Sequence, residues 1–587
     1  MRTIIIILLV TLNVGASAQS WTNPLTLNDE WPQYGIGDPY ILKHRGVYYL
    51  YCSTKDNSTG VKCWSTKDFV TWSGPYNCTG EAITKTAYAP EVVYWNGTFY
   101  MYTSPGGNGH YVLSSNSPTG PFTRITENLG KSIDGSIFID DNGAWYFYHA
   151  AEAGIQGCRM SSPTTIEQDV DLNARMGNGW TEGPTVVKRG GVYYLIYTGN
   201  HVISKGYRID YAQNTTGPIS AYTPQSRQNP ILINTEGAFV GLGHGSAFIG
   251  PDLDTYYYTY HNLESGSGPR RHLNFDRMAW NGTKLLLLGP TNWPQEPFRM
   301  ADMCDFFDRD QAGENLLFPN GGDWRLNDRE RLTQEHSAID DTCLYKALLK
   351  PSTDDDYTAE FTFKYLPGKS DDARFGAVFG YTDEANYGIA LWNCRTNRLE
   401  INFMTSAHWE TPRYANLPSG YRPEVWHHLR IEKAGTSHRF FVDGQQKAAI
   451  EKVTGGGKIG YATSRCQADF AYIAFSNQVN GSAIGNTYKP LPGSIAAVHC
   501  NTEGIGREKA TTVDAGTEGG YAIVARGDER YSYKINPKAA GRYHLALRYS
   551  ANEASRIRIR QGEREVTGVV ALPMTANRGT NWQTLTV

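Results

Sequence analysis

Three carboxylate side chains stand at nearly the same place in a repeated segment of the first half of the chain. Asp38, Asp134 and Glu182 each lie eight or nine residues before a turn glycine, and His244 lies ten residues before Asp254 in a looser copy. Hydrolysis of a glycosidic bond needs one carboxyl to protonate the leaving oxygen and another to act on the far side of the sugar. A third carboxylate nearby raises a neighbour's pKa by like-charge repulsion.

Each of these acids has a plainer interpretation, since an Asp or Glu at the start of a strand often caps a turn and Asp-Pro is a common turn dipeptide. The shared place of all three in one repeat favours the catalytic interpretation. The second copy differs, with Ala89-Pro90 at this place and Glu91 just beyond it.

The repeat is an aromatic phrase that follows a tight turn. The phrase at 46–51 recurs at 97–102, 143–148 and 191–195, with a looser copy at 254–258, and the starts are 51, 46, 48 and 63 residues apart. A short apolar run, a turn and an aromatic, β-branched run are typical of a β-hairpin. Five hairpins, each with room for two more strands, predict a five-bladed β-propeller, whereas a β-sandwich seldom shows such self-similarity. Equivalent blade positions face the central axis, so we expect the three carboxylates to meet in one cavity.

Composition agrees with an all-β protein. The chain has 587 residues, 40% of them hydrophobic and 19% charged, which excludes disorder. Fifty-five Lys and Arg against 58 Asp and Glu leave a net charge of −3, so no nucleic-acid partner is expected. The 61 glycines and 12% aromatic residues fit a protein with many turns and with surfaces that stack on flat ligands such as sugars.

The N-terminus has the features of an export signal over residues 1–18. Arg2 gives a positive start, 4–10 is apolar, and Ala16-Ser17-Ala18 has the small residues of a cleavage site. No later apolar run reaches the roughly 18 residues that a membrane span needs. We therefore expect a secreted or periplasmic protein without a membrane span.

Nine cysteines in an exported chain leave at least one unpaired if the others are oxidised. Cys52 and Cys63 either pair across a hairpin or are two buried free thiols. No Cys/His spacing in the sequence resembles a zinc site.

Five phrases of the first half, taken together, resemble family 43 glycoside hydrolases from about Trp31 to Pro290. They are Gly37–Ile41, Tyr88–Val92, Ser132–Ser136, Thr181–Pro184 and Gly243–Ser246. The resemblance implies a five-bladed propeller and an inverting mechanism, with Asp38 as general base and Glu182 as general acid. Asp134 would orient the acid and modulate its pKa. Inversion places a water between base and sugar, which separates the two carboxyls by about 6.5–9.5 Å.

The resemblance also implies the surroundings of these carboxyls. Arg271 aligns with an arginine that such enzymes place against the base, although Arg270 beside it is an alternative. Glu91, Arg271 and Tyr88 are predicted to bind substrate. His244 would lie near the axis, where such propellers hold a calcium ion or a water cluster; a hydrogen-bonded structural histidine is the alternative. No cofactor is expected for the chemistry itself, and a structural calcium ion is the metal to test for.

The implied substrate is an oligo- or polysaccharide of plant type from which terminal sugars are removed. The presence of Asp38 favours α-L-arabinofuranose over the exo-galactanase activity of relatives that lack this base, with β-xylose and β-galactofuranose as alternatives. One departure is Gly135, where the family often has proline. A non-catalytic sugar-binding propeller and a retaining fructan hydrolase are the competing classes, and Gly37–Tyr40 differs from the Asn-Asp-Pro-Asn start expected of the latter.

The second half predicts accessory modules. Residues 19–300 would form the propeller, and 301–478 a laminin-G- or concanavalin-like β-sandwich with two antiparallel sheets. That sandwich would shape the rim of the active site, bind glycan or simply buttress the propeller. Residues 479–587 weakly resemble a family 6 carbohydrate-binding sandwich, and their ending at Thr586-Val587 is typical of a truncated strand. The expected fold class is thus all-β, with a five-bladed propeller followed by two β-sandwich domains.

Overall fold

The computed structural model describes most of the chain after the predicted export signal, which lies outside the described residues. The described ranges are 20–54, 58–176, 180–226, 228–235, 237–264, 270–328, 330–336, 343–368, 370–483, 489–495, 497, 500, 507–509, 521–523, 529–575 and 581–587. The helices with defined bounds in these ranges are two short 3₁₀ turns, η1 (Ala82–Thr84) and η2 (Ala312–Glu314). Across the same ranges, no helix has the length and apolar character needed to cross a membrane.

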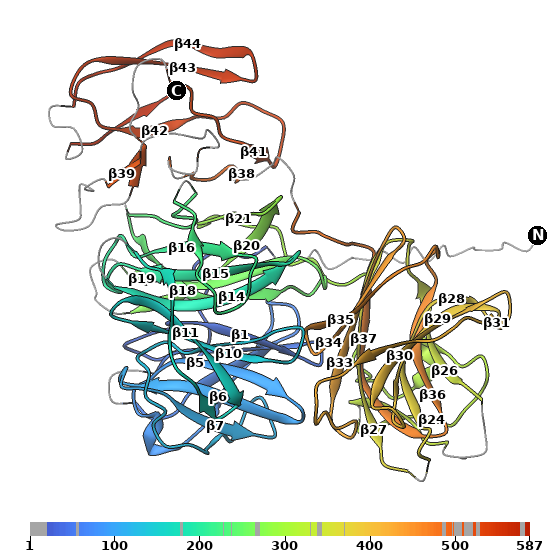
Figure 1. Cartoon of the computed structure of the whole chain (residues 1–587). Coiled ribbons are helices and arrows are strands. Elements are labelled where there is room, and N and C mark those ends of the chain that lie inside the picture. The colour runs from blue at the N-terminus through green and yellow to red at the C-terminus, as the bar shows by residue number, and fades with distance from the viewer. Residues whose placement is uncertain are drawn as a thin grey trace, which may run out of the picture.

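Five antiparallel sheets form the first half of the molecule (Figure 1). Blade one contains β1 (Tyr40–His44), β2 (Val47–Tyr51), β3 (Lys62–Thr66) and β4 (Trp72–Asn77). Blade two contains β5 (Ala87–Trp95), β6 (Thr98–Pro105), β7 (Tyr111–Ser115) and β8 (Thr123–Arg124). Blade three contains β9 (Ser136–Ile139), β10 (Trp145–Ala151), β11 (Gly154–Ser162), β12 (Thr165–Ile166) and β13 (Val170–Ala174).

Blades four and five complete the ring. Blade four contains β14 (Thr181–Arg189), β15 (Val192–Gly199), β16 (Arg208–Asn214) and β17 (Thr223–Pro224). Blade five contains β18 (Phe239–Ile249), β19 (Tyr256–Glu264), β20 (Arg271–Asn281) and β21 (Lys284–Leu287). The first strands β1, β5, β9, β14 and β18 contact one another in a closed circle. The predicted five-bladed propeller and the all-β class are confirmed.

The repeated aromatic phrase has a physical role in this ring. In the first three blades its last tyrosine is buried and donates a hydrogen bond to a proline carbonyl in an outer loop of the next blade; the pairs are Tyr51–Pro118, Tyr102–Pro163 and Tyr148–Pro218, at 2.5, 2.5 and 2.9 Å. A buried hydroxyl needs such a partner, and here the partner lies in the neighbouring blade. The repeat therefore both fills the space between blades and joins them.

The N-terminal segment joins the last blade to the first. Leu25 forms a β-bridge with Leu273 of β20 and Trp21 forms one with Gln295. The Asn23 amide donates to the carbonyl oxygen of Phe275 at 2.8 Å, and its oxygen accepts the Phe275 N–H at 2.9 Å. These bonds hold the start of the chain against blade five while β1 lies beside β18.

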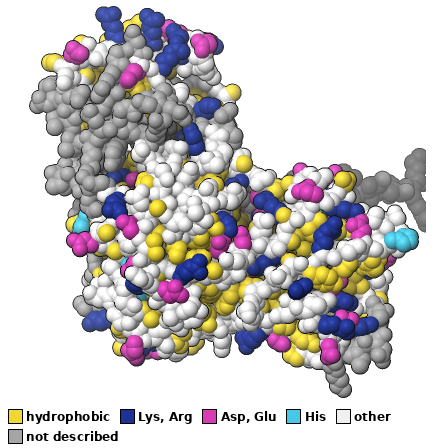
Figure 2. All heavy atoms as spheres, in the orientation of Figure 1, with side chains coloured by type: hydrophobic (Ala, Val, Ile, Leu, Met, Phe, Trp, Pro, Cys, Tyr) yellow, Lys and Arg dark blue, Asp and Glu magenta, His cyan; other side chains and the backbone are white. Residues whose placement is uncertain are grey.

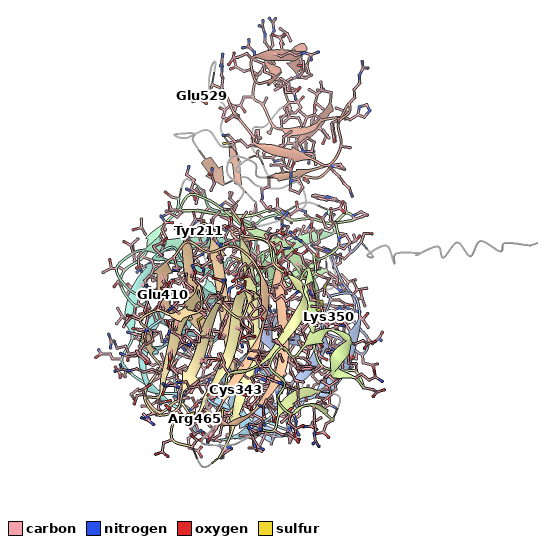
Figure 3. The ribbon with its side chains drawn as sticks, turned by 90° about the vertical axis from the view of Figure 1, so that its right-hand side faces the viewer. Tyr211, Cys343, Lys350, Glu410, Arg465 and Glu529 are labelled. Atoms are coloured by element: carbon pink, nitrogen blue, oxygen red, sulfur yellow. The ribbon has the colours of Figure 1, made fainter. Side chains whose placement is uncertain are left out.

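Two further sheets share one hydrophobic core and form a sandwich. The first sheet contains β22 (Met303–Asp305), β24 (Trp324–Asn327), β25 (Arg331–Gln334), β27 (Tyr357–Leu366), β33 (His427–Ala434), β34 (Ser437–Val442), β35 (Gln445–Glu451) and β37 (Gln467–Ser476). The second contains β23 (Leu316–Leu317), β26 (Tyr345–Ser352), β28 (Arg374–Asp383), β29 (Asn386–Asn393), β30 (Arg398–Thr405), β31 (His408–Trp409), β32 (Arg413–Asn416) and β36 (Lys458–Ser464). Figure 3 looks onto these strands, with Glu410, Lys350 and Arg465 on the sandwich.

The sandwich contacts the propeller at the turns between the first and second strands of several blades. Lys43 at the end of β1 donates to Glu360 of β27 at 2.6 Å, and the Gln446 N–H donates to Asp141 at 2.7 Å. Asn96 accepts two hydrogen bonds from Arg422, one at its side-chain oxygen and one at its carbonyl oxygen. These turns lie at the opposite ends of the first strands from Asp38 and its counterparts. Of the three roles expected for this module, the contacts favour buttressing.

The last described segments pair into two-stranded sheets beyond blade five, drawn in red in Figure 1. The pairs are β38 (Lys489–Leu491) with β41 (Ile535–Pro537), β39 (Arg507–Lys509) with β40 (Tyr521–Ile523), β42 (Ala546–Tyr549) with β45 (Gln583–Thr586), and β43 (Ser555–Gln561) with β44 (Arg564–Leu572). The Lys489 ammonium donates to the carbonyl oxygens of Leu287 and Gly289 and so anchors this region to blade five.

Candidate active site

The first strand of every blade carries the same backbone kink, just before the strand in blades one and three and within it in the others. Asp38, Ala89, Asp134, Gly183 and His244 have positive φ angles of 52°, 41°, 65°, 56° and 39°. This conformation costs a non-glycine residue on the order of 1–2 kcal/mol, and residues held in such conformations cluster at functional sites. Register shifts between Tyr88 and Glu91, Glu182 and Thr185, and Gly243 and Gly245 mark bulges in three of these strands, a feature that re-aims side chains.

The position of the kink shows that the three predicted acids are not at fully equivalent places in their blades. Asp38 and Asp134 occupy the kink itself, but its counterpart in blade four is Gly183, so Glu182 lies one residue earlier. A Cβ on Gly183 would lie 2.8 Å from the His244 ring, which explains why glycine stands there. The three buried carboxyls still converge: His244 contacts both aspartates, the Gly183 N–H beside Glu182 donates to Asp134, and Asp134 feels the charges of Glu182 and Asp38.

Asp38 is held as a carboxylate. Its Oδ1 accepts a hydrogen bond from Arg271 Nη1 at 2.7 Å and its Oδ2 accepts one from Ser53 Oγ at 2.5 Å. Burial alone would raise the pKa of Asp38, but the Arg271 guanidinium, with help from His244 and His261, holds this pKa well below its usual range. An ionised, hydrogen-bonded carboxylate is suited to accept a proton from water.

Arg271, rather than Arg270, is the arginine on this carboxylate. Its guanidinium lies over the Tyr34 ring at 4.0 Å, and a Cβ on Gly37 would approach its Cζ to 2.3 Å. Glycine at position 37 therefore makes room for the guanidinium. Arg270 is half-exposed, with its Nε 3.7 Å from Glu264.

Glu182 has the opposite electrostatic setting. Burial, reinforced by the charge of Asp38, raises its pKa to about 7, although the Tyr207 hydroxyl that donates to Oε1 at 2.5 Å works against this shift. At neutral pH much of Glu182 is therefore protonated. A protonated carboxylic acid can donate to a leaving oxygen.

Asp134 connects the other two carboxyls. Its Oδ2 accepts the Gly183 N–H at 3.2 Å, directly after Glu182, and lies 3.5 Å from His244 Nδ1. Burial and repulsion from Glu182 and Asp38 raise the pKa of Asp134 well above its usual range. The hydrogen bond to Gly183 fixes the backbone that carries Glu182, the geometry expected of a residue that orients the acid.

His244 bridges the two aspartates, with Nδ1 3.3 Å from Asp38 Oδ1 and 3.5 Å from Asp134 Oδ2. Asp38 is ionised and can only accept, so Nδ1 carries a proton here and cannot also ligate a cation. Calcium takes six to eight oxygen ligands, and Nε2 with waters is a poor match to that preference. The calcium site stays a prediction, and no step of the mechanism uses it.

A cavity of about 20 Å³ lies at the axis beside these groups, lined among others by Asp38, Glu91, Asp134 and His244. This is room for about one water molecule. Glu91 Oε1 accepts the Ile137 N–H at 2.7 Å, and burial raises the pKa of Glu91 to about 8. Tyr88 stands half-buried at the start of β5. Substrate binding by Glu91, Arg271 and Tyr88 remains a prediction.

Ser53, Tyr207 and His261 complete the site and were not predicted. His261 Nδ1 accepts the Asp38 N–H at 3.2 Å, and its ring stacks on Tyr207 with centroids 5.6 Å apart. Ser53 Oγ in turn accepts the Ala89 N–H at 2.7 Å. The sequence offered only a weak indication of these residues. Ser53 and His261 follow the aromatic phrases of second strands, and the ends of these strands lie near the central axis.

Comparison with known proteins agrees with this arrangement. Residues 33–284 match the family model for glycosyl hydrolases family 43. A β-D-galactofuranosidase of Aspergillus niger is 27% identical over 271 residues, which are 40% of this chain and 76% of that protein. A non-reducing end α-L-arabinofuranosidase of Bacteroides ovatus is 28% identical over 266 residues, 41% of this chain and 47% of that protein. A thermostable family-43 glycoside hydrolase of known structure is 30% identical, with 47% of this chain and 99% of that chain covered and a TM-score of 0.41.

This propeller buries one carboxyl with a lowered pKa and one with a raised pKa in the same site, and such a pair is what a glycosidase needs. The match over 33–284 specifies it further: this chain contains a family 43 glycosyl hydrolase domain. The chain spans less than half the length of several of its curated relatives. The extra sheets agree with sandwich-type modules, whose kinship to laminin-G or family 6 modules stays a prediction.

Proposed function

We propose that this chain is an exported, inverting exo-glycosidase that removes terminal α-L-arabinofuranose from plant-type polysaccharides. The main support for this mechanism is that two buried carboxyls in one site have pKa values shifted in opposite directions. The pKa of Asp38 lies well below its usual range, whereas the pKa of Glu182 is raised to about 7. Groups whose pKa values are pushed apart in this way serve as base and acid.

The proposed reaction is a single displacement. Glu182 gives its proton to the glycosidic oxygen while Asp38 takes a proton from a water that attacks the anomeric carbon from the opposite face. The bond to the leaving oxygen breaks as the bond to water forms, so the product has the inverted configuration. Asp38 then holds the extra proton and Glu182 the negative charge, and exchange with solvent restores both.

Arg271 and Asp134 would tune these two groups. The Arg271 guanidinium keeps Asp38 ionised before the attack, and Asp134, held neutral by burial, keeps the Gly183 backbone in place behind the acid. General acid–base assistance of this kind contributes about 10²–10⁴-fold in rate.

The sugar is chosen among close alternatives. The relative from Bacteroides ovatus is named an arabinofuranosidase and the one from Aspergillus niger a galactofuranosidase, and both names describe terminal furanosides. β-Xylose and exo-galactanase activity are further alternatives. On the face shown in Figure 2, basic and acidic side chains are interspersed, in line with a neutral glycan partner. The N-terminal signal features support a secreted or periplasmic location.

The test combines a substrate screen with the configuration of the product. Aryl α-L-arabinofuranoside, β-xyloside and β-galactofuranoside are offered to the full chain, and the first-formed anomer is followed by ¹H NMR. We expect the arabinofuranoside to react fastest with inversion, and Asp38→Asn to abolish turnover. The matched control Asp171→Asn, at an exposed carboxylate of β13, should keep full activity. Retention of configuration contradicts the mechanism, and binding without hydrolysis would instead indicate a sugar-binding propeller.

A further inference from the structure

Three side chains of blade three that the reaction does not use converge on one point. They are His149 near the end of β10, Cys158 in β11, and Asp169 between β12 and β13. His149 Nε2 and Cys158 Sγ each lie 3.0 Å from Asp169 Oδ1, and the three atoms lie within 4.8 Å of one another. The strand register explains the meeting: Cys158 pairs with Phe147, so His149, two residues further on, shares its face of the sheet.

The orientation of the histidine suits a metal ligand. His149 Nδ1 lies 3.0 Å from the carbonyl oxygen of Ala150, which can only accept, so Nδ1 carries the proton and Nε2 faces the cluster. A backbone carbonyl on one ring nitrogen is the usual arrangement when the other nitrogen binds a metal. His149 and Cys158 are buried, whereas the Asp169 side chain is 38% exposed and leaves a route from solvent.

Polar atoms from three residues crowd one carboxylate oxygen in this cluster. Cys158 Sγ and Lys131 Nζ donate to Asp169 Oδ1 at 3.0 and 2.9 Å, whereas His149 Nε2 faces the same oxygen with its lone pair. An oxygen of this kind has about two lone-pair sites. The two donors fill those sites, and the Nε2 lone pair facing the same oxygen marks a point at which a cation could bind.

We propose that His149 Nε2, Cys158 Sγ and Asp169 Oδ1 form a site for a zinc-class divalent ion, with water as the fourth ligand. Zinc bonds of about 2.0–2.3 Å in a tetrahedron place ligand atoms roughly 3.3–3.6 Å apart. The two 3.0 Å contacts need to open by only a few tenths of an ångström. The ion replaces the thiol proton, which leaves to solvent, and thiolate and carboxylate balance its charge without any change of oxidation state.

Binding moves Lys131 off Asp169, and this links the cluster to the active site. Lys131 lies three residues before Asp134, and the Ala150 N–H donates to the Ile133 carbonyl oxygen at 2.9 Å. The metal would thus tie β10, β11 and the segment before β13 together beside the strand that leads into Asp134. Its role is structural support of that strand.

The experiment titrates the full chain with Co²⁺, a spectroscopic substitute for zinc. We expect one equivalent to give a thiolate-to-cobalt absorption in the near ultraviolet and tetrahedral bands in the visible, both removed by excess Zn²⁺. Cys158→Ser, which keeps a donor for Asp169, should fold and lose the near-ultraviolet absorption. Cys304→Ser, remote from the cluster, is the matched control and should keep it.

Lys131→Gln separates a metal site from an ion-pair network. If Lys131 competes with the metal, its removal tightens Co²⁺ binding by about tenfold or more. If the cluster is only an ion-pair network, the variant loses stability and binds no metal. Absence of the thiolate absorption in the wild-type chain, or its persistence in both Cys158→Ser and His149→Gln, overturns the proposal.

Discussion

The hydrogen bond from Tyr207 to Glu182 gives a prediction with a definite sign. The hydroxyl donates to Oε1 at 2.5 Å and stabilises the ionised form of Glu182, so it lowers a pKa that burial raises to about 7. Tyr207→Phe removes this donor and must raise the pKa further. A hydrogen bond to a charged group contributes about 1.5–3 kcal/mol, and 1.36 kcal/mol corresponds to one pKa unit. Because Trp180 still donates to Glu182, we expect the lower end, a rise of about one unit.

The assay is the pH dependence of kcat/KM on an unactivated oligosaccharide, since a reactive aryl leaving group needs little acid assistance. The alkaline limb reports the acid of the free enzyme, and it should move from near pH 7 to near pH 8. Tyr211→Phe, a buried tyrosine of β16 whose hydroxyl bonds Gln228 (Figure 3), is the matched control and should leave the limb unchanged. An unmoved or lowered limb in Tyr207→Phe would show that Glu182 is not the titrating acid.

Two further substitutions test the charges that surround the site and the module interface. Arg271→Met leaves burial to raise the pKa of Asp38, so the acidic limb of kcat/KM should move to higher pH and activity at pH 6 should fall by about 10²-fold or more; an unchanged limb contradicts the role of the guanidinium. Glu360→Gln removes a buried carboxylate and leaves the partly buried Lys43 without its charged partner, and it should lower the free energy of unfolding by about 3 kcal/mol in urea denaturation. The control Glu410→Gln, whose carboxylate is more exposed than that of Glu360, should cost under about 1 kcal/mol, and equal losses would contradict the interface argument.

The repeat made the propeller predictable, because a phrase that recurs five times can only be explained by five similar hairpins. Its placement also located Asp38 and Asp134, which occupy the kink at the start of an innermost strand. Glu182 was found by the same count, although its strand places glycine at the kink. Burial of the fifth-blade strand then separates Arg271 from Arg270, a choice that spacing left open.

The remaining parts of the site depend on contacts between distant strands. Tyr207 and His261 reach the carboxyls through stacking across blades four and five, and no local spacing encodes that pair. The face on which the sandwich docks is likewise set by tertiary contacts such as that between Lys43 and Glu360. The cluster of His149 and Cys158 escaped detection because its spacing follows strand register rather than a metal-ligand motif.

Glu182 as proton donor is tested most directly by the leaving-group dependence of Glu182→Gln. The ratio of kcat/KM between wild type and variant is measured for an unactivated arabino-oligosaccharide and for an aryl arabinofuranoside with a strongly acidic leaving group. We predict a loss of about 10²–10⁴-fold on the oligosaccharide and a far smaller loss on the aryl glycoside. Equal losses on both substrates, or near-wild-type hydrolysis of the oligosaccharide, would contradict the assignment.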